Sequence, residues 1–383
     1  MKRNYIAKRF QNAGSGLTLD TEALAKYKDI IDLSIGDTDF ITDEGIINAA
    51  FRDAKAGYTR YGDPKGDPEL IDAVCRAWQE DFEQKLPHDH VLVSASSCLG
   101  MALVMFSILD PGDEVIVFSP YFPMYRTQIE LAGGVCVDVP TYASEDYAID
   151  EARLRAAITP RTKAIIFNNP TNPTGMAYGN DTLEMLARVA KEYDLLIAAD
   201  EIYTTYLYEG DFRPLRTLPG MAERTITLNS FSKNFLMTGW RVGVIIAEPE
   251  LLGVMNDING SLIYTAPSIS QRAAIHALSM RREIREKYVT AYRDRIFYTA
   301  DRIEKIPYLS LVRPKGTFYL FPGIEKTGLT DDEFCNVLLD KAHVLVSHGK
   351  AFGTAGAGHF RIACTVGIDT LKIAFDRMEK LSF

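Results

Sequence analysis

The sequence predicts an α/β protein: a mostly parallel seven-stranded sheet covered by helices, with a smaller α+β domain. Short apolar runs recur along the chain, each bounded by turn residues, as expected of strands that are buried on both faces. Helical patterns separate several of these runs, and strands that alternate with helices form parallel sheets. The pattern changes after residue 280, which predicts the second, smaller domain.

The large domain is predicted over residues 45–280. Its seven strands are expected, in chain order, at Val91–Ala95, Glu114–Phe118, Val135–Val139, Ala164–Phe167, Leu195–Ala199, Thr225–Leu228 and Val242–Ala247. A helix is predicted over Thr182–Tyr193, because its apolar residues recur at steps of three and four. Since open α/β sheets bind ligands beyond the carboxyl ends of their strands, functional residues are expected there.

The small domain is predicted to combine residues 1–44 with residues 281–383. It begins with a long helical pattern at Arg281–Lys305. Short strands are expected at Leu309–Val312, Thr317–Leu320 and His359–Ala363, and helices near Asp331–Lys341 and Asp369–Leu381. The first forty residues are irregular and polar, and we expect them to pack onto this part.

Composition excludes several function classes. Among the 383 residues the formal net charge is −9, and an acidic surface disfavours nucleic acid and anionic membranes. No apolar run approaches the roughly 20 residues that cross a bilayer. The five cysteines form no CxxC pair, so we expect reduced thiols in a cytoplasmic protein. The six histidines form no metal-ligand pattern, and no metal is expected.

Polar residues follow two neighbouring strand predictions. Asp200 and Glu201 end one apolar run; alone, an acid there is most often a turn or helix cap. Lys233 follows the next run within Ser230-Phe231-Ser232-Lys233, where apolar neighbours would desolvate its ammonium and lower its pKa, as a Schiff-base lysine requires. Arg241 lies between glycines eight residues later and could hold a phosphate as a bidentate fork.

Two further loops follow predicted strands. The stretch Asn168–Gly175 is rich in Asn and Pro, which builds a rigid turn and fixes amide groups at the mouth of the sheet. Ser96-Ser97-Cys98 precedes a helical run, and a helix N-terminus lined by small residues suits a phosphate. Serines also cap helices throughout proteins, so this second signal is weak alone.

Together these motifs resemble the class I/II aminotransferases, the aspartate aminotransferase family of fold type I pyridoxal-phosphate enzymes. SFSKNFLMTGWRVG resembles the lysine signature of that family, and NNPTNPTG and AADEIY precede it in the family's order. The resemblance extends from about Asp32 to the C-terminus.

The resemblance implies pyridoxal 5'-phosphate as the cofactor. Lys233 would form the aldimine with it and shuttle the substrate proton, and Asp200 would pair with the pyridine nitrogen. Tyr203 and Asn172 would hydrogen-bond the phenolic oxygen. Phe122 occupies the position of the stacking aromatic, which is often Trp or Tyr. The phosphate site would comprise Ser96, Ser97, Cys98, Ser230, Ser232 and Arg241.

The resemblance also implies the substrate site and a homodimer. Arg361 in GHFRIA would clamp the substrate α-carboxylate, with Gly36 and Asn172 beside it. Tyr61 in YTRYGDPKG would reach across a dimer interface to the cofactor phosphate of the partner. His348 stands where many members have proline, and either shapes specificity or is a surface histidine.

We therefore expect a ping-pong aminotransferase that moves an amino group from an L-amino acid, aspartate-like by family default, to a 2-oxo acid such as 2-oxoglutarate. A C–S β-lyase or an amino-acid decarboxylase on the same scaffold is the nearest alternative. A regulatory domain that binds the cofactor is more distant, because no basic helix-turn-helix is evident.

Overall fold

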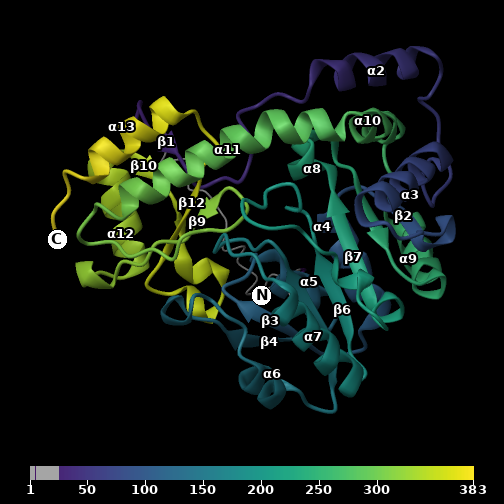
Figure 1. Cartoon of the computed structure of the whole chain (residues 1–383), viewed down its shortest axis with the longest axis horizontal. Helices are drawn as coiled ribbons and strands as arrows, with labels where there is room; N and C mark the ends of the chain where they lie inside the picture. Colours follow the sequence, from purple (N-terminus) through teal and green to yellow (C-terminus); the bar gives the residue numbers. More distant parts are fainter. Residues whose placement is uncertain (1–4, 6–25) are drawn as a thin grey trace.

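The predicted seven-stranded sheet is present. The computed structural model describes Tyr5 and residues 26–383, and the sheet has the strand order β2-β8-β7-β6-β5-β3-β4 (Figure 1). Its strands are β2 (Val91–Ser94), β3 (Glu114–Ser119), β4 (Val135–Pro140), β5 (Thr162–Asn168), β6 (Leu196–Asp200), β7 (Thr225–Ser230) and β8 (Gly243–Ile246).

The sheet is mostly parallel, as predicted. Strands β4, β3, β5, β6 and β7 pair in parallel, and only β8 runs antiparallel to its neighbours β7 and β2. The carboxyl ends of β2, β5, β6 and β7 therefore lie at the same edge of the sheet.

Helices cover both faces of the sheet because successive strand residues point to opposite sides. Val115, Val117 and Ile166 pack with α4 (Ser97–Ile108), α5 (Met124–Leu131) and α9 (Pro249–Leu262). Ile116 and Ile165 face the other way, toward α7 (Asn180–Glu192) and α6 (Glu151–Ala157). On that second face, β2 and β8 are covered by α3 (Pro68–Phe82) and α10 (Ser268–Ser279).

The C-terminal part has its own apolar cluster, which includes Leu33, Ile296, Phe334 and Phe375. Two small sheets form there, β1 with β10 and β11-β12-β9. The long helix α11 runs from the α10 side of the molecule to this part (Figure 1). The remaining elements are α2 (Glu44–Lys55), β1 (Ile31–Asp32), α11 (Arg281–Ile303), β9 (Tyr319–Leu320), α12 (Asp331–Val337), β10 (Val344–Leu345), β11 (Ser347–His348), β12 (Phe360–Ala363) and α13 (Ile368–Met378).

Two predictions for the C-terminal part were wrong in detail. Leu309–Val312 forms no strand: Ser310 exchanges backbone hydrogen bonds with Gly323 as an isolated bridge, and one bridge is too short to make a strand. The helix predicted to Lys341 leaves the α-helical geometry after Val337 and continues as a π-helical turn over Leu338–Ala342.

The N-terminal part of the small-domain prediction is covered only in part. Ile31 pairs in parallel with Val344, so the chain before α2 contacts the C-terminal part, as expected. Residues 1–4 and 6–25 of that prediction lie outside the described residues. Over the described part of the chain, no helix combines the length and the apolarity needed to cross a membrane.

Candidate active site

Residues at the strand ends form a staggered row across the sheet, in which Asp200 lies opposite Leu228, two residues before Ser230. The register places Asn168 of β5 opposite Asp200 of β6, and Ser230 of β7 opposite Gly243 of β8. Gly243 in turn lies opposite Ser94 of β2. Three motifs that are far apart in the sequence therefore meet at this edge.

The N-terminus of α4 joins the row. Ser96 is its N-cap and has φ +97°, a conformation that favours glycine and strains a side-chain-bearing residue. A Cβ on Gly243 would lie 2.8 Å from the backbone nitrogen of Ser97, so glycine at 243 allows the helix to approach the sheet closely. The free N–H groups of the first turn of α4 can hold an anion there.

A cavity of about 650 Å³ lies against these groups. It is lined by thirteen of the fourteen residues predicted from the sequence, which are Gly36, Ser96, Ser97, Cys98, Phe122, Asn172, Asp200, Tyr203, Ser230, Ser232, Lys233, Arg241 and Arg361. His348 lines it as well. Tyr61 is the predicted residue that does not: it is 82% exposed, and its ring contacts Tyr264 edge-on at 5.1 Å.

Lys233 extends into the cavity from the short helix that follows β7. Its Nζ donates a hydrogen bond to the carbonyl oxygen of Gly36 and lies 5.7 Å from the ring centre of Phe318. The amine is therefore held by one backbone acceptor and one aromatic face, without a carboxylate partner among the described residues.

Asp200 is buried with half of its carboxylate unused. Its Oδ2 accepts a hydrogen bond from the Tyr125 hydroxyl, whereas Oδ1 is buried and has no partner among the described residues. Burial raises the pKa of Asp200 to about 6, against the opposing effect of Tyr125. A cationic N–H placed at Oδ1 would satisfy this oxygen and favour the ionised carboxylate.

Arg361 is a buried cation without an anion. It is 4% exposed, and no described carboxylate forms an ion pair with it. Its Nη1 donates to Asn172 Oδ1 at 3.0 Å and its Nη2 to the carbonyl of Ser34 at 2.5 Å, but its buried Nε has no partner. Since a buried charge needs a counter-ion, this side chain is set to receive an anion.

Aromatic side chains form the remaining walls. The Tyr203 and Tyr319 hydroxyls lie 3.1 Å apart, and burial raises the pKa of Tyr203 far above its usual value. Phe122 packs edge-on against Tyr125 at 5.7 Å. Tyr203 is thus a neutral hydrogen-bonding group, and Phe122 contributes an apolar surface.

The residues predicted to bind the phosphate line the same cavity, but they differ in how many of their polar groups already have hydrogen-bond partners. The Ser230 hydroxyl accepts from the backbone N–H of Ser232 at 3.1 Å, and the Ser97 hydroxyl donates to the Asn229 carbonyl at 2.6 Å. Arg241 is exposed, and within the described part of the chain its one hydrogen bond goes to the Thr238 carbonyl, at 2.7 Å. Its guanidinium keeps further donors for an incoming anion.

Tyr125 and Tyr319 were not assigned these roles from the sequence. Tyr125 lies in the first turn of α5, three residues after Phe122, which precedes that helix, and its backbone N–H donates to the Phe122 carbonyl at 3.1 Å; only this closeness in sequence could have suggested that the two rings lie together. Tyr319 has no local signal, because its short strand resembles any buried strand.

The donor set fits an anionic phosphate ester that carries an aromatic ring with a basic nitrogen and an aldehyde. Asp200 Oδ1 suits the ring nitrogen, the first turn of α4 with Arg241 suits the phosphate, and Lys233 suits the aldehyde. Arg361 remains for a second anion, such as a substrate carboxylate. Across Tyr5 and residues 26–383, no group of three or more His, Cys, Asp or Glu residues could hold a metal ion.

Comparisons with known proteins agree with this geometry. Residues 28–378 match the family model described as aminotransferase class I and II. The chain is 36% identical over 373 residues to an aspartate aminotransferase of Pyrococcus abyssi, covering 93% of this chain and 92% of that protein. It is 34% identical over 359 residues to an arginine–pyruvate transaminase of Pseudomonas aeruginosa, covering 93% and 91%.

Solved structures give the same result. An alanine aminotransferase from Pyrococcus furiosus superposes with a TM-score of 0.93 at 33% identity and covers 98% of both chains. The three relatives are named for different amino acids, and nothing in the comparisons favours a β-lyase or a decarboxylase.

Proposed function

Because the chain belongs to the class I and II aminotransferases, we propose that Lys233, Asp200 and Arg361 are the core of a pyridoxal 5'-phosphate site that transfers the amino group of an L-amino acid to a 2-oxo acid. One observation carries this assignment. An unpaired buried cation, a half-satisfied buried carboxylate and an amine without a carboxylate partner all line one cavity. This family uses pyridoxal phosphate, and the donor set described above suits it.

Each residue has a distinct task in this proposal. When bound, pyridoxal 5'-phosphate supplies an aldehyde that takes up the amino group and a cationic ring that stabilises negative charge at the substrate Cα. Asp200 holds the ring nitrogen in its protonated form. Tyr203 and Asn172 donate hydrogen bonds to the phenolic oxygen, and Phe122 covers the ring.

Lys233 is the residue that moves protons. With the cofactor bound, its Nζ would be the group that accepts the proton of the substrate Cα and returns it on the cofactor side. Gly36, whose carbonyl accepts from Lys233, keeps the amine close to the substrate position. Apolar walls limit water, which favours transfer over side reactions.

Arg361 fixes the substrate by its α-carboxylate. Its planar fork can hold both carboxylate oxygens, and Asn172 and Ser34 set its orientation. Ser96, Ser97, Cys98, Ser230, Ser232 and Arg241 bind the phosphate at the other end of the cavity.

The donor side chain is the least constrained part of the proposal. Aspartate is the first donor to test and 2-oxoglutarate the first acceptor, since relatives include aspartate aminotransferases. Beyond Lys233, Arg241 and Arg361, the remaining basic side chain that lines the cavity is His348. Among the described residues that line the cavity, it is the basic group left to meet a side-chain carboxylate.

A half-reaction panel tests the proposal. Cofactor-loaded enzyme is mixed with each of the twenty amino acids, without an oxo acid, and the cofactor absorbance is followed. We expect a few amino acids to convert the cofactor to its amine form and to release their 2-oxo acids in equal amount. Lys233→Ala should bind cofactor and fail to convert it.

Two outcomes would contradict the proposal. Release of pyruvate and ammonia from cysteine-type substrates, or of carbon dioxide from any amino acid, without conversion would indicate a lyase or a decarboxylase. Full conversion by Lys233→Ala would assign the proton transfer to another group.

The proposal extends to the assembly and its setting. We propose a homodimer in which Tyr61 completes the phosphate site of the partner; its 82% exposure supports a contact outside its own chain. We also propose a large domain over residues 45–280 and a small domain over residues 1–44 and 281–383, supported by the separate C-terminal cluster. Free cysteines among the described residues support a cytoplasmic setting.

A further inference from the structure

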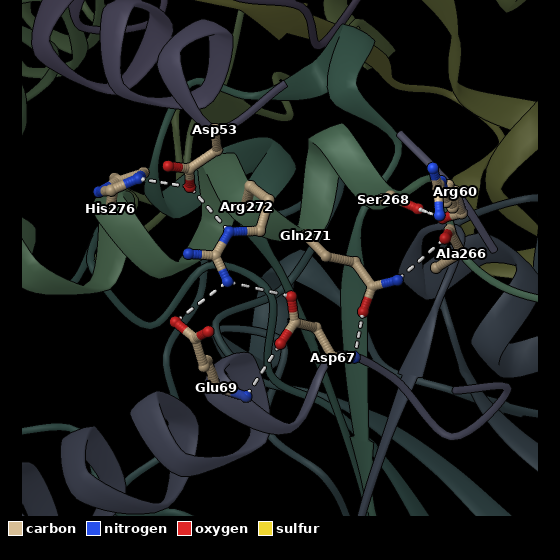
Figure 2. A network of polar contacts seen from close by, with 9 residues as sticks. All are labelled: Asp53, Arg60, Asp67, Glu69, Ala266, Ser268, Gln271, Arg272 and His276. Atoms are coloured by element: carbon tan, nitrogen blue, oxygen red, sulfur yellow. Dashed lines mark hydrogen bonds and ion pairs between the residues drawn. The ribbon is translucent and has the colours of Figure 1, made fainter. Parts of the chain in front are cut away.

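Arg272 is a buried cation surrounded by three carboxylates (Figure 2). Its side chain, on α10, is 8% exposed. Its Nε lies 2.7 Å from Asp53 Oδ2, and its Nη1 lies 3.2 Å from Asp67 Oδ2 and 3.1 Å from Glu69 Oε2. The guanidinium also stacks 4.1 Å above the ring of Tyr58. Only a planar fork can make all of these contacts together.

These carboxylates stand at the two ends of one exposed segment. Asp53 lies in the last turn of α2, Asp67 is the N-cap of α3, and Glu69 is in the first turn of α3. Residues 56–66 connect the two helices without helical or strand structure of their own. Arg272 therefore holds both ends of this connecting segment against α10.

The start of α10 also holds the middle of the segment (Figure 2). The Ser268 hydroxyl donates to the Arg60 carbonyl at 2.6 Å. Gln271 accepts from the backbone N–H of Asp67 at 2.6 Å and donates to the Ala266 carbonyl at 2.9 Å. The connecting segment is thus tied to one helix at three points, although its own backbone makes few regular hydrogen bonds.

The charges of this cluster depend on one another. Burial disfavours the charged form of Arg272, but its hydrogen bonds to Asp53, Asp67 and Glu69 outweigh burial and raise its pKa. Burial also works against ionised Asp53, yet hydrogen bonds from Arg272 and His276 lower the pKa of that carboxyl. Removing the guanidinium would leave three carboxylates close together, with His276 at Asp53 as their remaining basic partner among the described residues.

The connecting segment presents large aromatic side chains outward. Tyr61 is 82% exposed, and its ring rests edge-on against Tyr264, which is itself half exposed. A buried charge cluster is weak evidence for stability, because well-packed apolar residues in its place often stabilise a protein equally well. Its better-supported role is to fix the relative positions of the segments that it joins. Because residues 56–66 are fixed at three points, the exposed Tyr61 ring would lose little conformational entropy when a partner binds.

We propose that Arg272 is a positioning residue that fixes residues 56–66 so that Tyr61 is presented to the cofactor phosphate of a second copy of this chain. The inference rests on the proposed function, in which Tyr61 completes the phosphate site of the partner. Arg272 itself contacts neither cofactor nor substrate.

The test measures the cofactor dissociation constant of the dimer for four variants. We expect Tyr61→Phe to raise it about tenfold, the value of one hydrogen bond to a charged group. Arg272→Met should raise it by a similar factor, with kcat at saturating cofactor changed less than about twofold. The double variant should be no weaker than the worse single variant, because both changes remove the same contact.

Arg281→Met is the matched control. Arg281 is also a partly buried arginine with two acidic partners, Glu80 and Asp81 of α3, but it does not touch residues 56–66. It should leave the cofactor dissociation constant unchanged. If Arg272→Met fails to fold, Arg272→Lys replaces it: the charge is kept, the fork is lost, and a smaller rise is expected.

Mixed dimers separate positioning from a general structural effect. In one arrangement, Lys233→Ala and Arg272→Met are on the same subunit, so the subunit with an intact site receives its Tyr61 from the altered copy. We expect weakened cofactor binding at that intact site. In the reverse arrangement, with Arg272→Met on the subunit that keeps Lys233, binding at the intact site should be normal.

The failures are distinguishable. Weakened cofactor binding in the reverse arrangement, where Arg272→Met is on the subunit that keeps Lys233, would refute the role of Arg272. Additive losses in the double variant would refute it as well. Neither result would affect the proposed function. A Tyr61→Phe effect in trans without any Arg272 effect would also refute the role of Arg272 and leave the shared site standing. A wild-type chain that binds no cofactor would refute the proposed function and this inference with it.

Discussion

Glu201 should make the protein less stable as the pH rises, although it adjoins the proposed cofactor partner Asp200. Its side chain is 2% exposed, and Oε1 accepts the backbone N–H of Leu215 at 3.0 Å. Burial, aided by the charge of Asp200, raises its pKa from 4.5 to about 8. The folded protein therefore holds a proton on Glu201 that the unfolded chain loses near pH 4.5.

The magnitude follows from the two pKa values. Where only the folded state binds this proton, the free energy of unfolding falls by about 1.4 kcal/mol for each pH unit. Between roughly pH 5.5 and pH 8 the contribution of Glu201 therefore falls by about 3 kcal/mol. Glu201→Gln resembles the protonated form and can still accept from Leu215, so it should lack this loss.

Urea unfolding of wild type and Glu201→Gln, at equal subunit and cofactor concentrations, measures the effect. The difference in unfolding free energy between the two proteins should change by about 3 kcal/mol over that pH range, in favour of the variant at high pH. Cofactor and other titrating groups cancel in this difference. Equal pH dependence in both proteins would refute the argument from burial.

The same pair of acids separates structure from chemistry. Glu201→Gln should keep the cofactor and most of its activity, because Glu201 does not line the cavity. Asp200→Asn should lower kcat/KM by about a hundredfold or more, since it removes the charge that holds the ring nitrogen protonated. A larger loss in the Glu201 variant would reverse these assignments.

Three more outcomes are expected. Arg361→Lys keeps the charge and loses the fork, so KM for both amino acid and oxo acid should rise about 10- to 100-fold; unchanged KM values in steady-state kinetics would contradict the clamp. Ser96→Gly relieves the φ of +97° and should raise the free energy of unfolding by about 1 kcal/mol in urea unfolding; a less stable variant would count against strain at Ser96. His348 lines the cavity, and its Nδ1 lies 2.7 Å from Asp332, so we expect its ring to favour acidic amino-acid donors. His348→Phe should therefore lower the ratio of kcat/KM for aspartate to kcat/KM for phenylalanine. An unchanged ratio would show that His348 is a surface histidine without a role in specificity.

The sheet could be predicted because its signals are local. Each of the seven strands was predicted from its own apolar run, and each boundary was correct within a few residues. The prediction failed at Leu309–Val312, where three of the four residues are apolar but only Ser310 forms a β-bridge among the described residues. Strand formation there depends on a neighbour that the local sequence does not specify.

The sequence could predict which residues line the candidate site, but not which hydrogen bonds they make with one another. Polar residues at strand ends indicated the loops that carry Asp200, Lys233 and Arg241, and the family resemblance supplied the rest of the thirteen predicted residues that line the cavity, among them Gly36, Phe122 and Arg361. The hydrogen bond of Tyr125 to Asp200, the contact of Tyr319 with Tyr203 and the carbonyl of Ser34 at Arg361 had no signal of their own.

By itself the sequence predicted the fold class, because apolar periodicity is a property of neighbouring residues, and its motifs carried the resemblance that pointed to the family and to the candidate site residues. The resemblance pointed to Asp200 as the cofactor partner, but only the tertiary structure showed that Glu201 is sealed behind the cavity, where it accepts the backbone N–H of Leu215. Tertiary structure also decided that Arg272 of α10 gathers acids from α2 and α3. The physical reason is that burial, and the charges that burial brings together, arise only when segments distant in the chain pack against each other.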